Sequence, residues 1–421
     1  MIFLYNISVF VFNLGVRVAG LFHAKARAFV TGRKNVFRYI AGKIAQTNKP
    51  VVWVHCASLG EFEQGRPIME AIKREFEHYE IVLTFFSPSG FEIRKNYPLA
   101  FIVSYLPLDT HVNATRFVDL VKPRLAIFIK YEFWYHYSHA LRKRNIPLLS
   151  VSSIFRPDQV FFGRLGKFYQ RILWNFSYFF VQNEQSTKLL ASVGIYNVQI
   201  SGDTRFDRVN QIAQHAEDIS IAKKFKGNQR VFVVGSSWPE DMDVLIPFVN
   251  ENRLKFIIAP HEVSEASLTA VESVLHVKHV RYSQAKNENV DDCSVLIIDN
   301  VGLLSRLYGY GEFAYVGGAF GKGLHNVLEA ACYGIPVFFG NKNYEKFQEA
   351  TDLIKHGGAF EIKDYQDLKQ KYEMLNNPQS FLLACDVTKQ YVQQNLGATE
   401  RVMQFCRPLL TQVAYEPNSR P

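Results

Sequence analysis

The first acidic residue of the chain is Glu61, in the turn sequence Ser58-Leu59-Gly60-Glu61. Residues 1–60 contain eight lysine or arginine residues and no aspartate or glutamate. An apolar run that is typical of a buried strand precedes this turn, and apolar residues at helical spacing follow it. Ligands bind at such strand-to-helix junctions in open α/β sheets, so Glu61 is a candidate ligand-binding carboxylate. The alternative is that its charge only complements the positive N-terminus of the helix.

Two hydroxyl side chains, Ser236 and Ser237, follow another apolar run and precede Pro239. Proline is favoured at the first position of a helix, and Glu240 stands three residues after Ser237, which predicts a capping box. The free amides of a helix N-terminus, together with two hydroxyls, can also hold a phosphate. Helix capping alone is the alternative interpretation.

A glycine-rich stretch, VGGAFGKGLHNVLEA from Val316, contains His325, Asn326 and Glu329. Glycine lets the backbone approach a ligand closely, and a carboxylate just inside the following helix can accept both hydroxyls of a ribose. The stretch is not G-x-G-x-x-G in the first strand-helix unit, so a nicotinamide site is disfavoured. The pattern indicates a nucleotide site of another kind.

Strands that alternate with helices must position these residues. Six apolar runs up to about residue 183, and a second series from residue 198 to residue 340, predict two parallel α/β sheets separated by the polar stretch 207–228. We therefore expect an α/β protein with two doubly wound, Rossmann-like domains that face a cleft. The predicted ranges are an anchoring segment at 1–45, a first domain at 46–206, a second domain at 207–411 and a flexible tail at 412–421.

The charge and cysteine content restrict the possible functions. The formal net charge of the 421 residues is +9, but eight of these charges precede Glu61. The remaining chain carries 40 basic and 39 acidic residues, so a general nucleic-acid binder is disfavoured. The five cysteines form no C-x-x-C pair, which argues against a zinc site and agrees with a reducing cytoplasm.

The first sixteen residues are uncharged and mostly apolar, and basic residues follow them from Arg17 onward. The run is short for a span of about 20 residues, and Asn6, Ser8 and Asn13 interrupt it. This pattern favours an interfacial helix on an anionic membrane surface. A membrane-spanning helix and a helix buried in the fold are the alternatives, and a signal peptide is disfavoured because no basic region comes first.

With these motifs identified, the chain resembles the family of 3-deoxy-D-manno-octulosonic acid (Kdo) transferases, which have a GT-B fold. The family's S-x-G-E turn corresponds to Ser58–Glu61, and the resemblance implies that Glu61 is the general base. The sequence GDTRFD, from Gly202, resembles a family element in which lysine usually takes the place of Arg205. Residues that the resemblance or the motifs assign to the nucleotide site are Ser236, Ser237, Pro260, His261, Val301, Gly302, Leu303, His325, Asn326, Val327, Leu328 and Glu329.

The chain departs from the family pattern at one position. The family commonly has Glu-x-Glu-x-Trp-Pro, whereas this chain has Lys130 in place of the first glutamate and keeps Glu132 and Trp134. Lys130 thus stands where the family has a transition-state stabiliser. It can lie beside Glu61 and lower the pKa of that carboxyl group, or face the donor and stabilise developing charge. The second placement is preferred, because the family's role at this position concerns the transition state.

The resemblance implies an inverting transfer of Kdo from CMP-Kdo to a glucosamine hydroxyl of a lipid A precursor (lipid IVA), at the cytoplasmic face of the inner membrane. Glu61 would deprotonate the hydroxyl, and Arg205, Ser236 and Ser237 would stabilise the charge on the departing CMP. No cofactor and no metal are expected, because the scheme does not require a metal and we find no acidic D-x-D cluster between strands that would hold Mg²⁺ against a diphosphate.

Two alternative functions remain. One is a GT-B enzyme that uses a UDP-sugar, either a lipid-disaccharide synthase or an epimerase, because such enzymes share the architecture. The other is a membrane-tethered protein that binds a nucleotide without catalysis.

Overall fold

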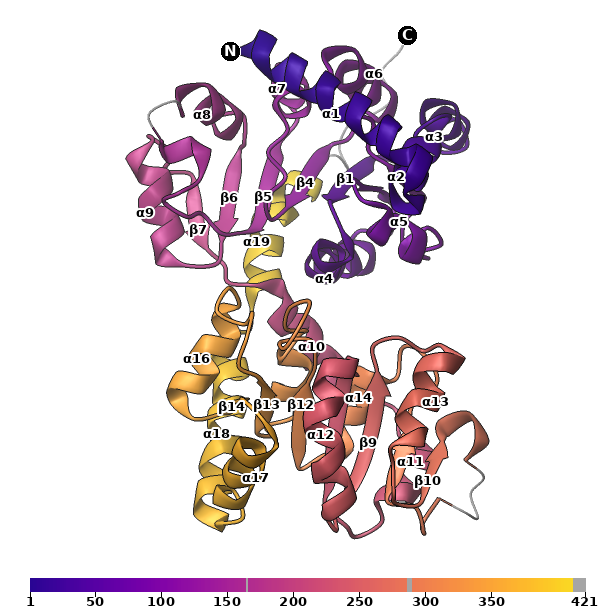
Figure 1. Cartoon of the computed structure of the whole chain (residues 1–421). Helices are drawn as coiled ribbons and strands as arrows, with labels where there is room; N and C mark the ends of the chain where they lie inside the picture. Colours follow the sequence, from indigo (N-terminus) through magenta and orange to yellow (C-terminus); the bar gives the residue numbers. More distant parts are fainter. Residues whose placement is uncertain (164–165, 286–289, 412–421) are drawn as a thin grey trace. The chain divides into compact units, whose positions relative to one another are not determined.

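The computed structural model describes residues 1–163, 166–285 and 290–411, and its chain divides into two compact units. The first unit contains residues 1–208 and the C-terminal segment from Gly397, and the second contains residues 209–396. Figure 1 shows a sheet flanked by helices in each unit. The expectation of two parallel α/β domains is confirmed.

The sheet of the first unit has seven parallel strands in the order β3-β2-β1-β4-β5-β6-β7. All six residues of β1 are buried, as expected for a strand that is covered on both faces. The strand order reverses between β1 and β4. The strands are β1 (Val51–Cys56), β2 (Glu80–Phe85), β3 (Ile102–Tyr105), β4 (Leu125–Ile129), β5 (Leu148–Ser153), β6 (Tyr178–Val181) and β7 (Val198–Ile200).

Helices cover both faces of this sheet, and two separate hydrophobic cores result. Trp53 belongs to one core and its neighbour Val54 to the other, because successive side chains of a strand point to opposite faces. The helices of the first unit are α1 (Ile2–Phe22), α2 (Ala24–Gly32), α3 (Val36–Ile44), α4 (Leu59–Glu75), α5 (Pro88–Arg94), α6 (His111–Val121), α7 (Tyr135–Lys143), α8 (Lys167–Leu173), α9 (Glu184–Ser192) and α19 (Ala398–Thr411), with a short 3₁₀ helix at Val160–Phe162. Helix α10 (Thr204–Gln214) contains the boundary between the two units.

The second unit has its own parallel sheet, in the order β10-β11-β9-β8-β12-β13-β14, and here the order reverses between β8 and β12. Its strands are β8 (Val231–Ser237), β9 (Lys255–Pro260), β10 (His279–Arg281), β11 (Val295–Ile297), β12 (Phe313–Val316), β13 (Val337–Gly340) and β14 (Ala359–Ile362). Its helices are α11 (Ser220–Lys226), α12 (Pro239–Glu251), α13 (Glu265–Ser273), α14 (Leu304–Leu307), α15 (Leu328–Ala331), α16 (Gln348–His356), α17 (Tyr365–Met374) and α18 (Pro378–Gln394), with 3₁₀ helices at Tyr282–Gln284 and Tyr308–Tyr310.

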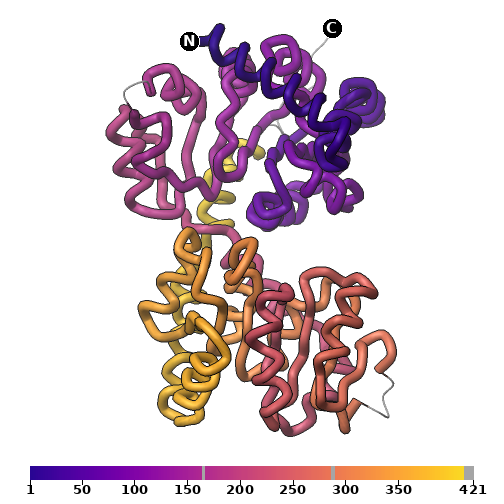
Figure 2. Tube along the Cα trace, viewed as in Figure 1, coloured from indigo at the N-terminus to yellow at the C-terminus, as the bar shows by residue number. Residues whose placement is uncertain are grey.

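The predicted second domain, 207–411, is wrong at its C-terminal end, because α19 belongs to the first unit. The yellow trace in Figure 2 shows this helix beside the first sheet. The hydroxyl of Tyr79 donates to the carbonyl of Leu410 at 3.0 Å, and the carboxylate of Asp207 accepts the backbone N–H groups of Gly397 and Thr399 at 2.7 and 2.6 Å. These contacts tie the end of the chain to the first unit. The predicted tail, 412–421, lies outside the described residues.

Helix α1 is, within the described residues, the one helix long and apolar enough to cross a membrane. Its polar side chains nevertheless bond to the first unit. The hydroxyl of Tyr5 donates to Asp109, and the side-chain oxygen of Asn6 lies 2.7 Å from Nε2 of His136. The apolar residues Phe3, Phe10 and many of their neighbours remain exposed. The helix is therefore part of the folded unit and has one uncovered apolar face.

Candidate active site

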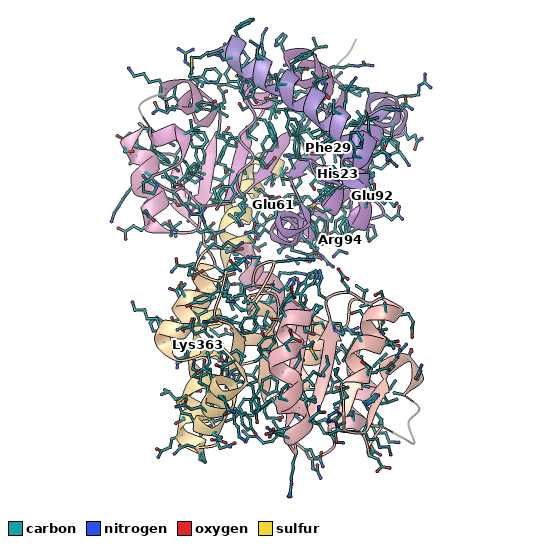
Figure 3. All side chains as sticks on the ribbon, viewed as in Figure 1. His23, Phe29, Glu61, Glu92, Arg94 and Lys363 are labelled. Atoms are coloured by element: carbon teal, nitrogen blue, oxygen red, sulfur yellow. The ribbon has the colours of Figure 1, made fainter. Side chains whose placement is uncertain are left out.

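The candidate residues of the first unit lie at the carboxyl ends of β1 and β4, where the strand order reverses. Open α/β sheets bind ligands at this position, because the connections that follow the two strands leave in opposite directions and open a crevice. Ser58 and Glu61 follow β1, and residues 130–134 follow β4. Glu61 is labelled in Figure 3 at the start of α4.

Glu61 both caps its helix and remains available for chemistry. Its Oε2 atom accepts the backbone N–H of Ser58 at 2.6 Å and the hydroxyl of Ser58 at 2.8 Å, and Ser58 is the N-cap of α4. The capping interpretation from the sequence is therefore correct. It does not exclude the functional one, because both of these bonds go to one carboxylate oxygen.

The surroundings of Glu61 raise its pKa above the usual value. Burial is the main cause, and the negative charge of Glu132 adds to it. The hydrogen bonds from Ser58 and the positive charge of Lys130 act in the opposite direction but are smaller effects. A carboxylate with a raised pKa is a stronger base, so this position is suited to accept a proton.

Glu132 is held by a buried network that the sequence analysis did not include. Its Oε2 atom lies 2.9 Å from Nε2 of His55 and accepts the indole N–H of Trp134 at 2.6 Å. The other ring nitrogen of His55 lies 2.8 Å from the hydroxyl of Thr84, which also accepts the indole N–H of Trp53 at 2.8 Å. Polar residues inside buried strands were the signal that could have indicated this network.

Lys130 has a backbone conformation that is uncommon for a residue with a side chain, with φ of 66°. Its N–H donates to the carbonyl of Val151 at 2.8 Å, and its ammonium lies 5.4 Å from the ring centre of Tyr131. Its charge lowers the pKa of Glu61, which supports the placement beside Glu61 that the sequence analysis did not prefer.

Arg205 lies in the first unit, where it is paired with an acid. Its Nε donates to Asp203 at 2.9 Å, and the same carboxylate oxygen accepts the amide of Gln64 at 3.0 Å. These contacts hold the pKa of Asp203 below its usual value against the effect of burial. The role of Arg205 at the donor phosphate stays a prediction.

The candidate residues of the second unit lie at the corresponding position, at the carboxyl ends of β8 and β12. Ser236 has a φ of 53°, and the pairing of β8 with β9 shifts register here so that Ser237 lies opposite Pro260. Ser237 is buried, and within the described residues its hydroxyl has no hydrogen-bond partner. A buried hydroxyl without a partner is costly, which is typical of a group that a ligand satisfies.

The predicted capping box at Ser237 and Glu240 is wrong by one residue. The N-cap of α12 is Trp238, whose N–H donates to the carboxylate of Asp241 at 2.8 Å. Asp241 also accepts the N–H of Gly318 at 2.8 Å and the hydroxyl of Tyr315 at 2.7 Å. The strand continues to Ser237 because of the register shift, and this displaces the start of the helix.

Three aromatic rings stack at this end of the sheet. The ring centres of Trp238 and His261 are 4.3 Å apart, those of His261 and His325 are 4.5 Å apart, and the indole N–H of Trp238 donates to Nε2 of His325 at 3.0 Å. The ammonium of Lys322 lies 3.8 Å from the ring centre of Trp238. Both histidines were predicted from the sequence, whereas Trp238 and Lys322 were not.

Burial favours the neutral form of both histidines of this stack. Burial lowers the pKa of His325 to about 4, and the neighbouring His261 adds to the effect. Burial also lowers the pKa of His261. The ammonium of Lys322 adds a positive charge beside the stack.

The glycine-rich loop packs closely on this stack. A Cβ atom on Gly317 would lie 2.3 Å from the carbonyl oxygen of Ser236, and Gly318 has a φ of 95° with a Cβ position 2.9 Å from His325. A side chain at either position would displace the backbone that forms the site.

The remaining predicted residues lie at the end of the glycine-rich stretch and on the loop that follows β11. The amide of Asn326 donates to Glu329 at 3.2 Å, and its oxygen accepts the N–H of Leu328 at 3.3 Å, where the short helix α15 begins. Val327, the N-cap of this helix, is buried. Val301, Gly302 and Leu303 follow β11, and Val301 is 89% exposed. Such exposure leaves the side chain available to a ligand.

Within residues 1–163, 166–285 and 290–411, no group of three or more histidine, cysteine, aspartate or glutamate side chains is arranged to hold a metal ion.

Sequence comparisons identify relatives over most of the chain. Residues 33–208 match the family described as 3-deoxy-D-manno-octulosonic-acid transferase (kdotransferase). A 3-deoxy-D-manno-octulosonic acid transferase of Rickettsia bellii is 25% identical over 371 residues, which cover 86% of this chain and 87% of the relative. The transferase of Aquifex aeolicus is 27% identical over 342 residues, which cover 79% of this chain and 88% of the relative.

Solved structures with the same fold include enzymes of several kinds. The UDP-GlcNAc 2-epimerase from Neisseria meningitidis aligns with a TM-score of 0.59 and 13% identity, over 84% of this chain and 98% of the epimerase. MurG of Acinetobacter baumannii aligns with a TM-score of 0.54 and 12% identity, over 86% of this chain and 99% of MurG. These likenesses confirm the GT-B type of fold and say nothing about the donor.

Proposed function

We propose that this chain is a Kdo transferase and moves Kdo from CMP-Kdo to a glucosamine hydroxyl of a lipid A precursor in lipopolysaccharide biosynthesis, which its similarity to such transferases over most of its length supports. The main structural support for this chemistry is the position of Glu61. This carboxylate lies where an α/β sheet binds ligands, and burial and Glu132 raise its pKa.

In the proposed reaction, Glu61 takes the proton of the acceptor hydroxyl while the hydroxyl oxygen attacks the anomeric carbon of Kdo. The bond from that carbon to the phosphate of CMP breaks at the same time, and CMP leaves with the electron pair. Attack from the face opposite to CMP inverts the anomeric centre. General-base catalysis of this kind contributes about 10²- to 10⁴-fold to the rate.

The second unit supplies groups that suit a nucleotide with an acidic sugar. The ammonium of Lys322 and the free hydroxyl of Ser237 can interact with the phosphate or the Kdo carboxylate, and the carboxylate of Glu329 can accept ribose hydroxyls. The neutral stack of Trp238, His261 and His325 offers polarisable surface without adding charge. No metal takes part in this scheme.

We also propose that the enzyme works on the cytoplasmic face of the inner membrane, where a lipid acceptor is accessible to a cytoplasmic nucleotide-sugar. The exposed apolar face of α1 and the basic residues that follow it support this location.

The test is product analysis with purified full-length protein, CMP-Kdo and lipid IVA. Mass spectrometry should show the mass of at least one added Kdo, and a chelator should leave the rate unchanged. A parallel reaction with UDP-N-acetylglucosamine should give no product. If the UDP-sugar reacts and CMP-Kdo does not, the donor assignment is wrong; if neither reacts and CMP still binds, the non-catalytic alternative is favoured.

A further inference from the structure

A cavity of about 520 Å³ lies in the first unit beside α1. Its polar lining comes from Asn13 and Arg17 of α1, from Arg33 and Lys34 between α2 and α3, and from Asn113 of α6. Phe29, which is labelled in Figure 3, contributes apolar lining on the α2 side. None of these residues belongs to the candidate active site.

The positive charges around this cavity are not neutralised by the protein. The lining contains no aspartate or glutamate, and residues 1–60 have none at all. Among the described residues, Arg17, Arg33 and Lys34 form no ion pair with a carboxylate. Three cations that surround one cavity repel each other, so an anion between them would lower the free energy of the folded protein.

Arg33 is held in a fixed orientation. Its Nε donates to the carbonyl of Leu106 at 2.9 Å, and its two terminal nitrogens donate to the carbonyls of Phe29 and Phe86 at 3.0 and 2.7 Å. The guanidinium also lies 3.5 Å from the ring centre of Phe29. A guanidinium has five N–H donors, so two remain for a ligand after these three bonds. Burial lowers the pKa of Arg33 to about 9, which still leaves it charged at neutral pH.

The same stretch of α1 carries an exposed apolar surface. Asn13 and Arg17 are four residues apart and share one face of the helix. Phe10, Leu14 and Val18 lie beside them and are 65%, 54% and 53% exposed. A ligand whose anionic group occupies the cavity would therefore extend toward an apolar surface. The acyl chains of a lipid can cover such a surface, whereas a small soluble anion cannot.

We propose that this cavity binds the phosphate of an anionic membrane lipid, with Arg17, Arg33 and Lys34 around the phosphate and the acyl chains along α1. The site fixes one headgroup at a defined position, which general attraction between basic residues and an anionic surface would not do. The proposal goes beyond the transferase reaction and does not depend on it, because binding is measured without CMP-Kdo.

The experiment measures binding of full-length protein to phosphatidylcholine vesicles that contain phosphatidic acid. The cavity variant is Arg17→Gln with Lys34→Gln. The matched control is Lys25→Gln with Arg38→Gln, which removes the same charge from two exposed residues of the same segment that do not line the cavity. If only general attraction to the anionic surface acts, each cation removed should lower the vesicle affinity by about fivefold. Both variants would then lose the same affinity.

The proposal predicts that the cavity variant loses at least about tenfold more affinity than the control, because charge-assisted hydrogen bonds are lost as well. Equal losses in the two variants would overturn it. A second arm measures inorganic phosphate by calorimetry: if the cavity variant loses phosphate binding but keeps the vesicle affinity of the control, the site takes free phosphate and the lipid assignment is wrong. Should the double variant unfold, Arg17→Gln is compared with Lys25→Gln under the same criteria.

Discussion

At the scale of single residues, Glu61 combines two roles that a substitution can separate. Glutamine keeps a carbonyl oxygen that accepts the bonds from Ser58, so Glu61→Gln should preserve the helix cap and the melting temperature. It removes the basic oxygen, and we expect kcat to fall by at least about a hundredfold while CMP affinity stays nearly unchanged. Steady-state kinetics and calorimetry measure the two quantities.

Glu63→Gln is the control for this substitution. Glu63 pairs with Arg94 at 2.8 Å on the partly exposed side of the same helix, away from the Ser58 cap. Its substitution should reduce kcat by less than about threefold, since an exposed ion pair contributes about 1 kcal/mol or less. Wild-type turnover in Glu61→Gln would show that Glu61 only caps α4.

The two charges near Glu61 predict opposite shifts of the pH–rate profile. The base must be ionised, so activity is lost as the pH falls through the pKa of Glu61. Lys130 lowers this pKa, and Lys130→Met should therefore move the acidic limb to higher pH. Glu132 raises it, and Glu132→Gln should move the limb to lower pH, since glutamine can still accept bonds from His55 and Trp134.

The measurement is kcat/KM from pH 4 to pH 9 for both variants and for the wild-type protein. The ordinary pKa of a glutamate side chain, about 4.3, is the reference value for the acidic limb. A large loss of rate at every pH in Lys130→Met, with no shift of the limb, would instead mean that Lys130 acts on the donor. If the acidic limb moves in the same direction in Lys130→Met and in Glu132→Gln, Glu61 is not the titrating group.

At the scale of elements, α1 decides how the protein meets the membrane. Its polar residues Tyr5 and Asn6 bond to Asp109 and His136 of the folded unit, and we therefore expect the helix to lie on a membrane surface instead of crossing it. In everted membrane vesicles, protease added to the outside should digest both an N-terminal epitope tag and the first unit, because both lie on the same side of the membrane. Protection of the tag while the first unit is cleaved would indicate a span.

Asp109 connects α1 to the active site through α7. Its carboxylate accepts the N–H groups of His136 and Tyr137 at 3.0 Å each, at the start of the helix whose N-cap is Trp134. Trp134 in turn donates to Glu132. Helix α1 and Glu132, the acid that raises the pKa of Glu61, are therefore both bonded to the N-terminal end of α7.

At the scale of the whole molecule, the chain returns to its first unit after completing the second. Val402, Met403, Cys406 and Leu410 of α19 are fully buried in the core that also contains Ile68 and Ile72 of α4. Burial of each such side chain contributes about 1.5 to 3 kcal/mol, compared with a total stability of about 5 to 15 kcal/mol. Deletion of residues 398–421 should therefore unfold the first unit.

The second unit is continuous in sequence, from Val209 to Leu396, and should keep its fold and its CMP affinity in the same deletion. Calorimetry of unfolding and of CMP binding separates the two effects. A truncated protein with an unchanged first transition would show that α19 only lies on the surface of the unit.

Local patterns were sufficient for much of this structure. Apolar runs predicted the buried parallel strands, because such strands are covered on both faces and need no polar alternation. The turn at Ser58 and the glycine-rich loop were recognisable, because a helix start and a close backbone approach require particular residue types at neighbouring positions. The family resemblance was carried by the same short motifs.

Other features depend on residues that are distant in the chain, which no local pattern encodes. The pKa of Glu61 depends on Glu132, the network behind it joins His55 to Thr84, and α19 packs on α4 across more than 300 residues of sequence. The capping box lies at Trp238 and Asp241, one residue after the predicted position, because β8 continues to Ser237 through a register shift with β9. The sequence by itself determined the two sheets and the types of residue at their carboxyl ends. Only the tertiary structure decided which charges meet, because electrostatic energy and burial depend on distance in space and not on separation along the chain.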